Sequence, residues 1–167
     1  MKISAHEEYG LRCLVEVGKR GSGKSVTIPE ISVAEDISIS YTAKLLGILR
    51  RNGFVMSARG KAGGYSLSRP AGQIAISDVM AALGGRVFSP DFCKLHPGQG
   101  SACVHSTDCS LRTLWRTINE AIDGVLSKTT LQDLLRGEAE MNIWIRGFRL
   151  ARDAPPVALE RAKPSAM

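Results

Sequence analysis

The stretch from Thr27 to Val55, TIPEISVAEDISISYTAKLLGILRRNGFV, decides the fold of this 167-residue chain. It begins as a short helix with Pro29 near the first turn, where proline is well tolerated. A turn around Asp36 and Ile37 separates this helix from a longer one. Two helices joined by so short a turn are typical of a helix-turn-helix.

The second helix of the pair has clear signals at both ends. Ser38 or Ser40 can cap its first turn with a hydroxyl oxygen, and Gly53 stops it with a residue that tolerates positive φ. Its buried stripe is supplied by Leu45, Ile48 and Leu49. We therefore expect the first turn of this helix to face outward.

Two short segments with alternating apolar residues follow, 54–58 and 65–68, and the sequence RGKAGG joins them. This pattern predicts a β-hairpin, or wing. Its tip is basic and has little side-chain bulk, so the backbone can approach a sugar-phosphate strand while Arg59 or Lys61 enters a minor groove. A helix-turn-helix followed by a basic wing predicts a protein that binds double-stranded DNA.

The formal net charge of +6 is concentrated towards the N-terminus. Residues 37–77 contain no acidic side chain but hold six basic ones: Lys44, Arg50, Arg51, Arg59, Lys61 and Arg69. A surface of one sign attracts polyanions such as DNA, although charge alone would fit a solvated basic face equally well. The expected DNA contacts are Ser38, Ser40, Tyr41, Lys44, Arg50, Arg51, Arg59 and Lys61, with Lys44 contacting base edges.

Three of the four cysteines, Cys93, Cys103 and Cys109, lie within FCKLHPGQGSACVHSTDCSLRTLW, residues 92–115. The segment between the first two is too rich in Gly and Pro to hold a helix, so a loop can bring three thiolates to one centre. In a reducing cytosol, clustered cysteines are typical of metal ligands or redox sensors. Cys13 differs, because it lies in a helical apolar pattern that favours a structural role.

The spacing of the cysteines leaves the bound group open. Three thiolates and one further ligand suit an iron–sulfur centre or zinc, but the gaps of nine and five residues differ from the Cys-X2-4-Cys pairs common at structural zinc sites. His96 and His105 are candidate fourth ligands, or solvent-exposed side chains. A redox or electron-transfer protein is a competing class. No catalytic set accompanies the cysteines, so an enzyme is not expected.

A long helix is predicted after the last cysteine. Its apolar stripe exceeds what a small domain needs for its own core, which favours a homodimer. The stripe consists of Leu111, Leu114, Trp115, Ile118, Ile122, Val125 and Leu126. The predicted fold is mainly α with a small β-wing: a winged helix-turn-helix domain plus a long dimerisation helix. The division is a DNA-binding domain 1–85, a cysteine loop 86–110, dimerisation and C-terminal helices 111–150, and a disordered tail 151–167.

The N-terminus MKISAHEEYG lacks the basic-then-apolar order of a signal peptide, and no apolar run approaches the roughly 18 residues of a membrane span. A cytoplasmic protein without a membrane partner is therefore expected. Further short helices are predicted at 77–83 and 129–135, and an amphipathic helix at 138–150.

These motifs together resemble the bacterial iron–sulfur winged-helix regulators, the family that includes IscR, NsrR and RirA. The resemblance covers about residues 1–136 and rests on MKIS with Tyr9 and Arg12, ISISYTAKLLGILRRNGFV, RGKAGGYSLSRP, ISDVMAALGG, three cysteines before LW, and TLQDLL. It implies a dimeric transcription factor whose iron–sulfur cluster, [2Fe–2S] or [4Fe–4S], changes its affinity for DNA.

Three departures from the family pattern bear on the site. Arg112 occupies the position of the ligating histidine of the IscR kind, and a guanidinium that stays protonated cannot coordinate. Ala43 and Lys44 replace an acidic-amide pair, and the gap between the first two cysteines is longer than usual. The resemblance to NsrR proteins, which place a ligating aspartate in the first helix across the dimer, implies Glu8 as the fourth ligand. The alternative is that Glu8 only favours the helix N-terminus through its dipole.

Overall fold

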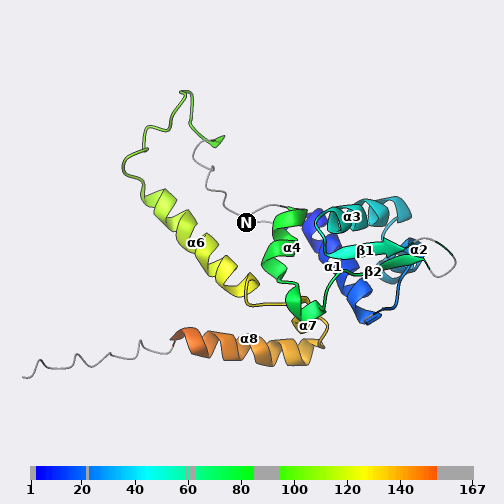
Figure 1. The fold of residues 1–167 in the computed structure, drawn as a ribbon. Helices are drawn as coiled ribbons and strands as arrows, with labels where there is room; N and C mark the ends of the chain where they lie inside the picture. The colour runs from blue at the N-terminus through cyan, green and yellow to red at the C-terminus, as the bar shows by residue number, and fades with distance from the viewer. Residues whose placement is uncertain (1–2, 22, 59, 61–62, 85–94, 154–167) are drawn as a thin grey trace, which may run out of the picture. The chain divides into compact units, whose positions relative to one another are not determined.

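The computed structural model describes residues 3–21, 23–58, 60, 63–84 and 95–153. The chain forms two compact units, 1–135 and 136–167. The first unit contains, in order, α1 (Ala5–Lys19), α2 (Ile28–Glu35), α3 (Ile39–Arg51), β1 (Val55–Ala58), β2 (Gly64–Leu67), the 3-10 helix η1 (Ala71–Gln73), α4 (Ile76–Leu83), α6 (Ser110–Leu126) and α7 (Leu131–Leu134) (Figure 1). The second contains α8 (Glu138–Asp153).

Helix α1 begins at Ser4 with a capping box. The Ser4 hydroxyl accepts a hydrogen bond from the Glu7 amide at 3.3 Å, and the Glu7 carboxylate accepts one from the Ser4 amide at 2.7 Å. Two amides that the helix itself leaves without acceptors are thereby satisfied. Glu7 is buried in this role, whereas Glu8 beside it is exposed.

The helix-turn-helix is confirmed in α2 and α3. A second capping box, formed by Thr27 and Glu30, starts α2. Asp36 ends that helix in the left-handed region, at φ 52°, which aspartate tolerates better than most residues. The Ser38 hydroxyl accepts a hydrogen bond from the Tyr41 amide at 3.3 Å and so caps α3. The turn and the cap fix the direction in which the first turn of α3 faces.

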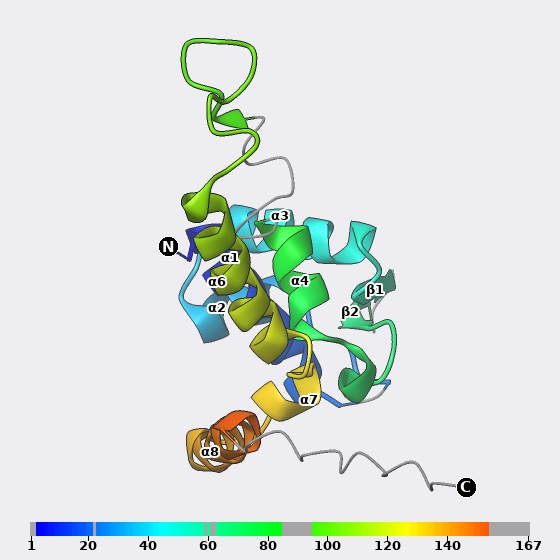
Figure 2. The same ribbon diagram turned by 90° about the vertical axis from the view of Figure 1, so that its left-hand side faces the viewer.

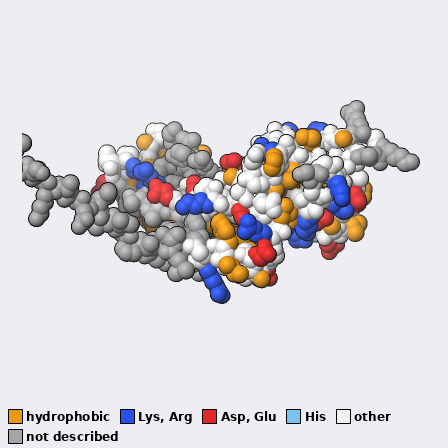
Figure 3. Space-filling view, turned by 60° about the horizontal axis from the view of Figure 1, so that its bottom comes forward, with side chains coloured by type: hydrophobic (Ala, Val, Ile, Leu, Met, Phe, Trp, Pro, Cys, Tyr) orange, Lys and Arg blue, Asp and Glu red, His pale blue; other side chains and the backbone are white. Residues whose placement is uncertain are grey.

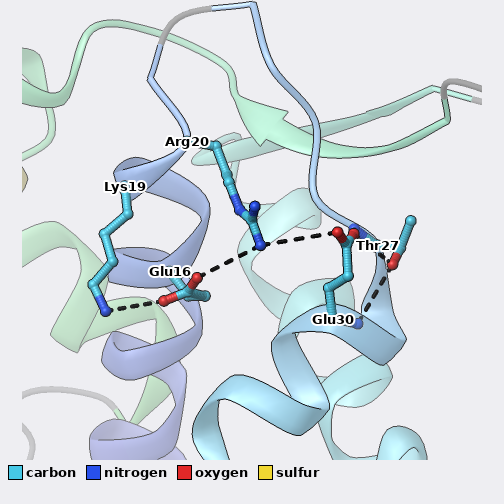
Figure 4. Close-up of polar contacts among 5 residues, drawn as sticks. All are labelled: Glu16, Lys19, Arg20, Thr27 and Glu30. Atoms are coloured by element: carbon cyan, nitrogen blue, oxygen red, sulfur yellow. Dashed lines mark hydrogen bonds and ion pairs between the residues drawn. The ribbon is translucent and has the colours of Figure 1, made fainter.

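Ion pairs connect the end of α1 to the start of α2 (Figure 4). Glu16 pairs with Lys19 at 2.9 Å and with Arg20 at 3.9 Å, and Arg20 also lies 3.9 Å from Glu30. These basic side chains are half-exposed, so each pair contributes at most about 1 kcal/mol. Their larger effect is to neutralise the cations at this end of the molecule.

The wing is an antiparallel pair of strands, β1 and β2, in the register Val55↔Leu67 to Ala58↔Gly64. A β-bridge between Val26 and Tyr65 ties the wing to the segment before α2. Gly64 has a φ of 151°, and a Cβ there would lie 2.8 Å from the Val26 carbonyl oxygen. Glycine is therefore required where the wing approaches the helical body.

The core of the first unit lies between α1, α3 and α4, with one contribution from α7. Its fully buried side chains include Leu14, Val17, Leu45, Leu46, Leu49, Ile74, Val79 and Leu131. Glycines permit close approach between α1 and α4, since a Cβ on Gly10 would lie 2.4 Å from Leu83 and one on Gly84 would lie 2.4 Å from Glu7. The first turns of α1 thus pack against the end of α4.

The chain returns to this core after α6. The Leu131 amide donates to the Ile74 carbonyl oxygen at 2.9 Å, and the Ile76 amide donates to that of Thr129 at 2.9 Å. The bridge that results, between Ala75 and Thr130, was not predicted. It explains why α7 is shorter than the predicted helix at 129–135, because Thr129 and Thr130 are drawn into extended pairing.

Helix α6 runs beside α4, as Figures 1 and 2 both show. None of its residues is buried. Helix α8 continues to Asp153, past the predicted end at Leu150, because the first proline after its start is Pro155. Within the described residues no helix has the length and hydropathy of a membrane span.

Candidate nucleic-acid interface and cysteine loop

The first turn of α3 presents several of the predicted DNA contacts to solvent. Ser38, Ser40 and Lys44 are exposed, whereas Tyr41 is half-buried. The Ser38 and Ser40 hydroxyls lie 3.3 Å apart, so one can donate to the other. The first two turns of α3 thus combine hydroxyls and the Lys44 ammonium group, which can contact phosphates and base edges.

The cations of α3 differ from those of α1. Lys44, Arg50 and Arg51 are exposed, and none forms an ion pair with a described residue. Arg50 donates to the Ser57 hydroxyl of β1 at 3.3 Å, which places its guanidinium between α3 and the wing. Figure 3 shows a face on which Lys and Arg side chains lie close to Asp and Glu side chains. The exposed cations of α3 are thus not neutralised by neighbouring carboxylates of the described chain, whereas those at the end of α1 are.

Arg69 is basic but has a structural role. Its guanidinium donates to the carbonyl oxygens of Gly53 and Gln73, each at 3.2 Å, and lies 5.2 Å from the centre of the Phe54 ring. These contacts hold the segment after the wing against the end of α3. The predicted contacts Arg59 and Lys61 lie outside the described residues.

A polar and aromatic cluster connects the first turns of α1 and α3. The Tyr41 hydroxyl lies 3.3 Å from His6 Nδ1, within hydrogen-bond distance, and the His6 and Tyr9 rings meet the Tyr41 ring edge-on at 5.4 and 6.1 Å. Tyr9 is also covered by Arg12, whose guanidinium carbon lies 5.3 Å from the ring centre.

Arg12 extends this cluster to α2. Its Nε donates to the Glu35 carboxylate at 2.6 Å and its Nη2 to the Glu35 carbonyl oxygen at 2.9 Å. The hydrogen bond with Glu35 raises the pKa of Arg12 above its ordinary value. Helix α1 is therefore bonded to both helices of the DNA-binding motif. In the sequence Tyr9 and Arg12 carry the family resemblance without a defined role, and no periodicity marks His6.

The described part of the cysteine loop ends at the start of α6. Cys103 and Cys109 are half-buried free thiols, while Cys93 lies outside the described residues. Arg112 holds the loop between them: its Nη2 donates to the carbonyl oxygens of His105 and Ser106, both at 2.8 Å. Its Nε is buried without a hydrogen-bond partner in the described chain. Arg112 thus acts on the loop by binding its backbone.

The start of α6 has a free thiol and an open depression beside it. Cys109 occupies the N-cap position and its side chain makes no capping hydrogen bond. An open depression beside it is lined by His105, Asp108, Ser110 and Leu111. His96 interacts with another part of the chain, so it is not a free side chain.

Two thiols and one carboxylate among the predicted ligands are free of other bonds. Cys103 and Cys109 are not committed to a disulfide. The exposed Glu8 carboxylate interacts electrostatically with Arg12 but makes no side-chain hydrogen bond or ion pair among the described residues. No three His, Cys, Asp or Glu side chains gather closely enough to hold a metal in the described part of the chain, which does not include Cys93. Burial raises the pKa of Cys13 to about 12, so this thiol is not available as a ligand at neutral pH.

The fold and the exposed first turn of α3 define a winged helix-turn-helix protein of the DNA-binding class. The family model "Rrf2: Iron-dependent Transcriptional regulator" matches residues 3–137, and the chain belongs to this family. It is a DNA-binding transcriptional regulator and not an enzyme.

Relatives and solved structures agree with this assignment. The HTH-type transcriptional regulator IscR of Cronobacter sakazakii is 31% identical over 143 residues, which cover 86% of this chain and 85% of the relative. IscR of Salmonella paratyphi B is 30% identical, with 93% and 90% covered. The structure of CymR, described as the global cysteine regulator of B. subtilis, matches with a TM-score of 0.66 at 30% identity, covering 81% of this chain and 96% of that one. T. potens IscR matches with a TM-score of 0.64 at 26% identity, with 81% and 86% covered.

Proposed function

We propose that this regulator is a homodimer whose affinity for its operator is controlled by an iron–sulfur cluster. Cys93, Cys103 and Cys109 supply three thiolates, and Glu8 of the partner protomer supplies a carboxylate oxygen. The observation that carries this proposal is the loop at the start of α6, where two free thiols flank a segment that Arg112 holds by its backbone.

Each donor has a distinct part in this proposal. The thiolates bind the cluster, which when bound supplies chemistry that oxidants or nitric oxide can alter. The Glu8 side chain is exposed, whereas the Glu7 carboxylate forms the capping box of α1. Of these two carboxylates, Glu8 can therefore bind a cluster without breaking a hydrogen bond at the start of the helix. Carboxylate oxygen is an unusual donor to iron–sulfur centres, and a labile fourth ligand suits a sensor.

The contacts of α1 provide a route from the ligand to the DNA. Glu8 and His6 share the first turns of α1, and His6 meets Tyr41 in the first turn of α3. A change in α1 on loss of the fourth ligand therefore changes the support of the helix that enters the major groove. Such coupling requires only that the cluster bind one arrangement of the dimer better than the other.

On the DNA side, the exposed first turn of α3 enters the major groove. Ser38, Ser40 and Tyr41 contact phosphates, while Lys44 donates to a guanine, which can discriminate by about 1–3 kcal/mol. Arg50 and Arg51 bind phosphates at the far end of α3. Arg59 and Lys61 of the wing reach the minor groove.

The second copy of the chain covers the apolar stripe of α6. Leu111 is 60% exposed, Leu114 50% and Trp115 41%, although all three lie on the apolar stripe. Such a run of exposed apolar side chains is typical of an interface. In this arrangement residues 86–110 connect the DNA-binding domain to the dimer helix.

Anaerobic purification tests the cluster. We expect a coloured protein with iron and acid-labile sulfide in defined ratio, which also distinguishes [2Fe–2S] from [4Fe–4S]. Replacing Cys93, Cys103 or Cys109 by Ala should each abolish the chromophore, whereas Cys13→Ala should leave it. A colourless protein that contains zinc would overturn the sensor proposal in favour of a structural metal site.

The fourth ligand is tested by Glu8→Gln, with Glu140→Gln on α8 as the matched control. We expect Glu8→Gln to shift the visible spectrum or to accelerate cluster loss in oxygen or nitric oxide, and Glu8→Asp to restore wild-type behaviour in part. Equal spectra and decay rates for Glu8→Gln and wild type would return Glu8 to a role at the helix N-terminus.

The interface is tested by Leu114→Glu, with Met56→Glu in the wing as the control, since Met56 is similarly exposed at 51%. Sedimentation should show monomers for the α6 variant and dimers for the control. If Leu114→Glu stayed dimeric, α6 would not be the interface. DNA binding that weakens steeply with salt would distinguish the regulator from an electron-transfer protein.

A further inference from the structure

Ile39 is an apolar residue in an unusual place. It is the first residue of α3 and its side chain is 57% exposed. Its neighbours Ser38 and Ser40 are exposed and polar. The other large apolar side chains of α3 are buried or half-buried, so among the described residues of this helix the exposed one is Ile39.

Ile39 is not needed by the core. Helix α3 buries Thr42, Leu45, Leu46 and Leu49, and Ile39 is not among the half-buried side chains that pack against the core cluster. In the free protein an isoleucine at this position leaves apolar surface in contact with water, which a polar residue would not do. The residue is therefore explained better by something that covers it from outside.

The position of Ile39 points towards DNA. In helix-turn-helix proteins the first residues of the second helix contact base edges. The Cα–Cβ bonds of a helix tilt towards its N-terminus, so a side chain at the first position projects beyond the end of the helix. The exposed cations of α3 and the absence of acidic residues from 37 to 77 match a polyanion and disfavour an ordinary apolar protein partner.

We infer that Ile39 recognises a thymine in the operator through contact with its 5-methyl group. The major-groove edges of the four bases present hydrogen-bonding groups, and thymine alone adds a methyl. An isoleucine cannot hydrogen-bond, so this methyl is the base feature that it can bury. The inference rests on the proposed entry of α3 into the major groove and adds a specific base preference to it.

Thymine-to-deoxyuridine replacement provides the test, because it removes the methyl and keeps the base pair. An operator selected in vitro with the purified protein is altered at one thymine at a time. For the wild type we expect one position in each half-site at which affinity falls about fourfold, the effect of losing one buried methyl. The same replacement elsewhere should change affinity little.

The Ile39→Ala variant closes the cycle. This variant should bind the unmodified operator more weakly than wild type does. Its affinity should not fall further when the methyl-sensitive thymine is replaced by deoxyuridine. Met56→Ala, an exposed apolar residue of β1, is the control and should keep the wild-type sensitivity. Since Ile39 is exposed, Ile39→Ala should fold normally, and circular dichroism checks this.

Two results would overturn the contact between Ile39 and thymine but leave the proposed entry of α3 into the major groove intact. One is DNA binding with no methyl-sensitive position, and the other is equal sensitivity to deoxyuridine in wild type and Ile39→Ala. Absence of any operator binding by the wild type would instead remove the proposed role of α3, and the inference with it. Weaker binding of Ile39→Ala to every sequence alike would show that Ile39 contacts the backbone and would also overturn it.

Discussion

The DNA-binding part of the chain, α1 to α4, and the long helix α6 use apolar residues in opposite ways. Leu14, Leu45 and Leu46 are fully buried, whereas Leu111 and Leu114 are at least half exposed. Both regions have helical apolar patterns in the sequence. The difference teaches that an apolar stripe predicts burial without saying whether the covering surface belongs to the same chain.

The starts of the helices differ in the same way. Helices α1, α2 and α3 each begin with a hydroxyl that caps the first turn, at Ser4, Thr27 and Ser38. Helix α6 begins at Cys109, whose thiol makes no such bond. Helix α4 also lacks a side-chain cap, but its N-cap residue is Ala75, which has no polar group, whereas the uncapped start of α6 leaves a thiol available for another partner.

The largest expected difference between the two regions is in the rate at which their thiols are alkylated. Cys13 is fully buried and its thiol has a pKa raised to about 12, so alkylation requires unfolding. Because folded domains are stable by about 5–15 kcal/mol, cluster-free protein should react at Cys13 at least roughly a thousand times more slowly than at Cys103 or Cys109. Iodoacetamide labelling followed by mass spectrometry measures these rates. Comparable rates would show that the core of α1 opens locally.

Leucine truncation gives the next effect. Leu46→Ala should lower the free energy of unfolding by about 2–5 kcal/mol, because it leaves a cavity in a closed core. Leu114→Ala should leave the unfolding of the first unit within about 0.5 kcal/mol under conditions where the protein is monomeric. Urea denaturation at low protein concentration compares the two. A large loss from Leu114→Ala would mean that α6 is covered within its own chain.

Arg112→Ala should have a moderate effect confined to the loop. It removes two hydrogen bonds from a charged donor to the His105 and Ser106 carbonyl oxygens, a change of about 1 kcal/mol at a partly exposed site. Cleavage by subtilisin between Cys103 and Cys109 should become several times faster. Arg116 is an exposed cation on the same helix, so Arg116→Ala serves as the control. Equal cleavage rates for the two variants would show that the hydrogen bonds of Arg112 do not hold the loop.

The smallest effect concerns the cap of α2. The Glu30 carboxylate accepts hydrogen bonds from the Thr27 amide and hydroxyl, both at 2.8 Å, and these hold its pKa below the ordinary value. A lowered pKa means that the cap stabilises the fold above the unfolded-state pKa and that this contribution is lost as the pH falls through the folded-state pKa. Glu30→Gln should therefore melt slightly below wild type at pH 7 and together with it near pH 2. A gap that persists in acid would contradict this.

Local signals in the sequence predicted most of the fold. The Ser4–Glu7 capping box, the turn at Asp36 and the stop at Gly53 all depend on residues within one or two helical turns of each other, so their chemistry is visible in the sequence. The burial of Cys13 followed from the apolar pattern around it.

Contacts between distant residues were missed. His6 and Tyr41 have no local pattern that pairs them, and Leu131 reaches the core only because the chain returns beside Ile74. For the candidate site, chemistry excluded Arg112 as a ligand but gave it no other role. The clamp that it forms uses backbone carbonyl oxygens, which every residue possesses and which therefore leave no trace in the sequence.

The bridge between Ala75 and Thr130 has an evolutionary consequence. It joins the two ends of residues 76–129, which contain α4, the cysteine loop and α6, so these residues form a long loop closed at its base. The entropy of closing such a loop grows only with the logarithm of its length, and a few added residues cost a small fraction of 1 kcal/mol. The spacing between Cys93 and Cys103 can thus lengthen in one lineage and shorten in another while the DNA-binding domain keeps its shape.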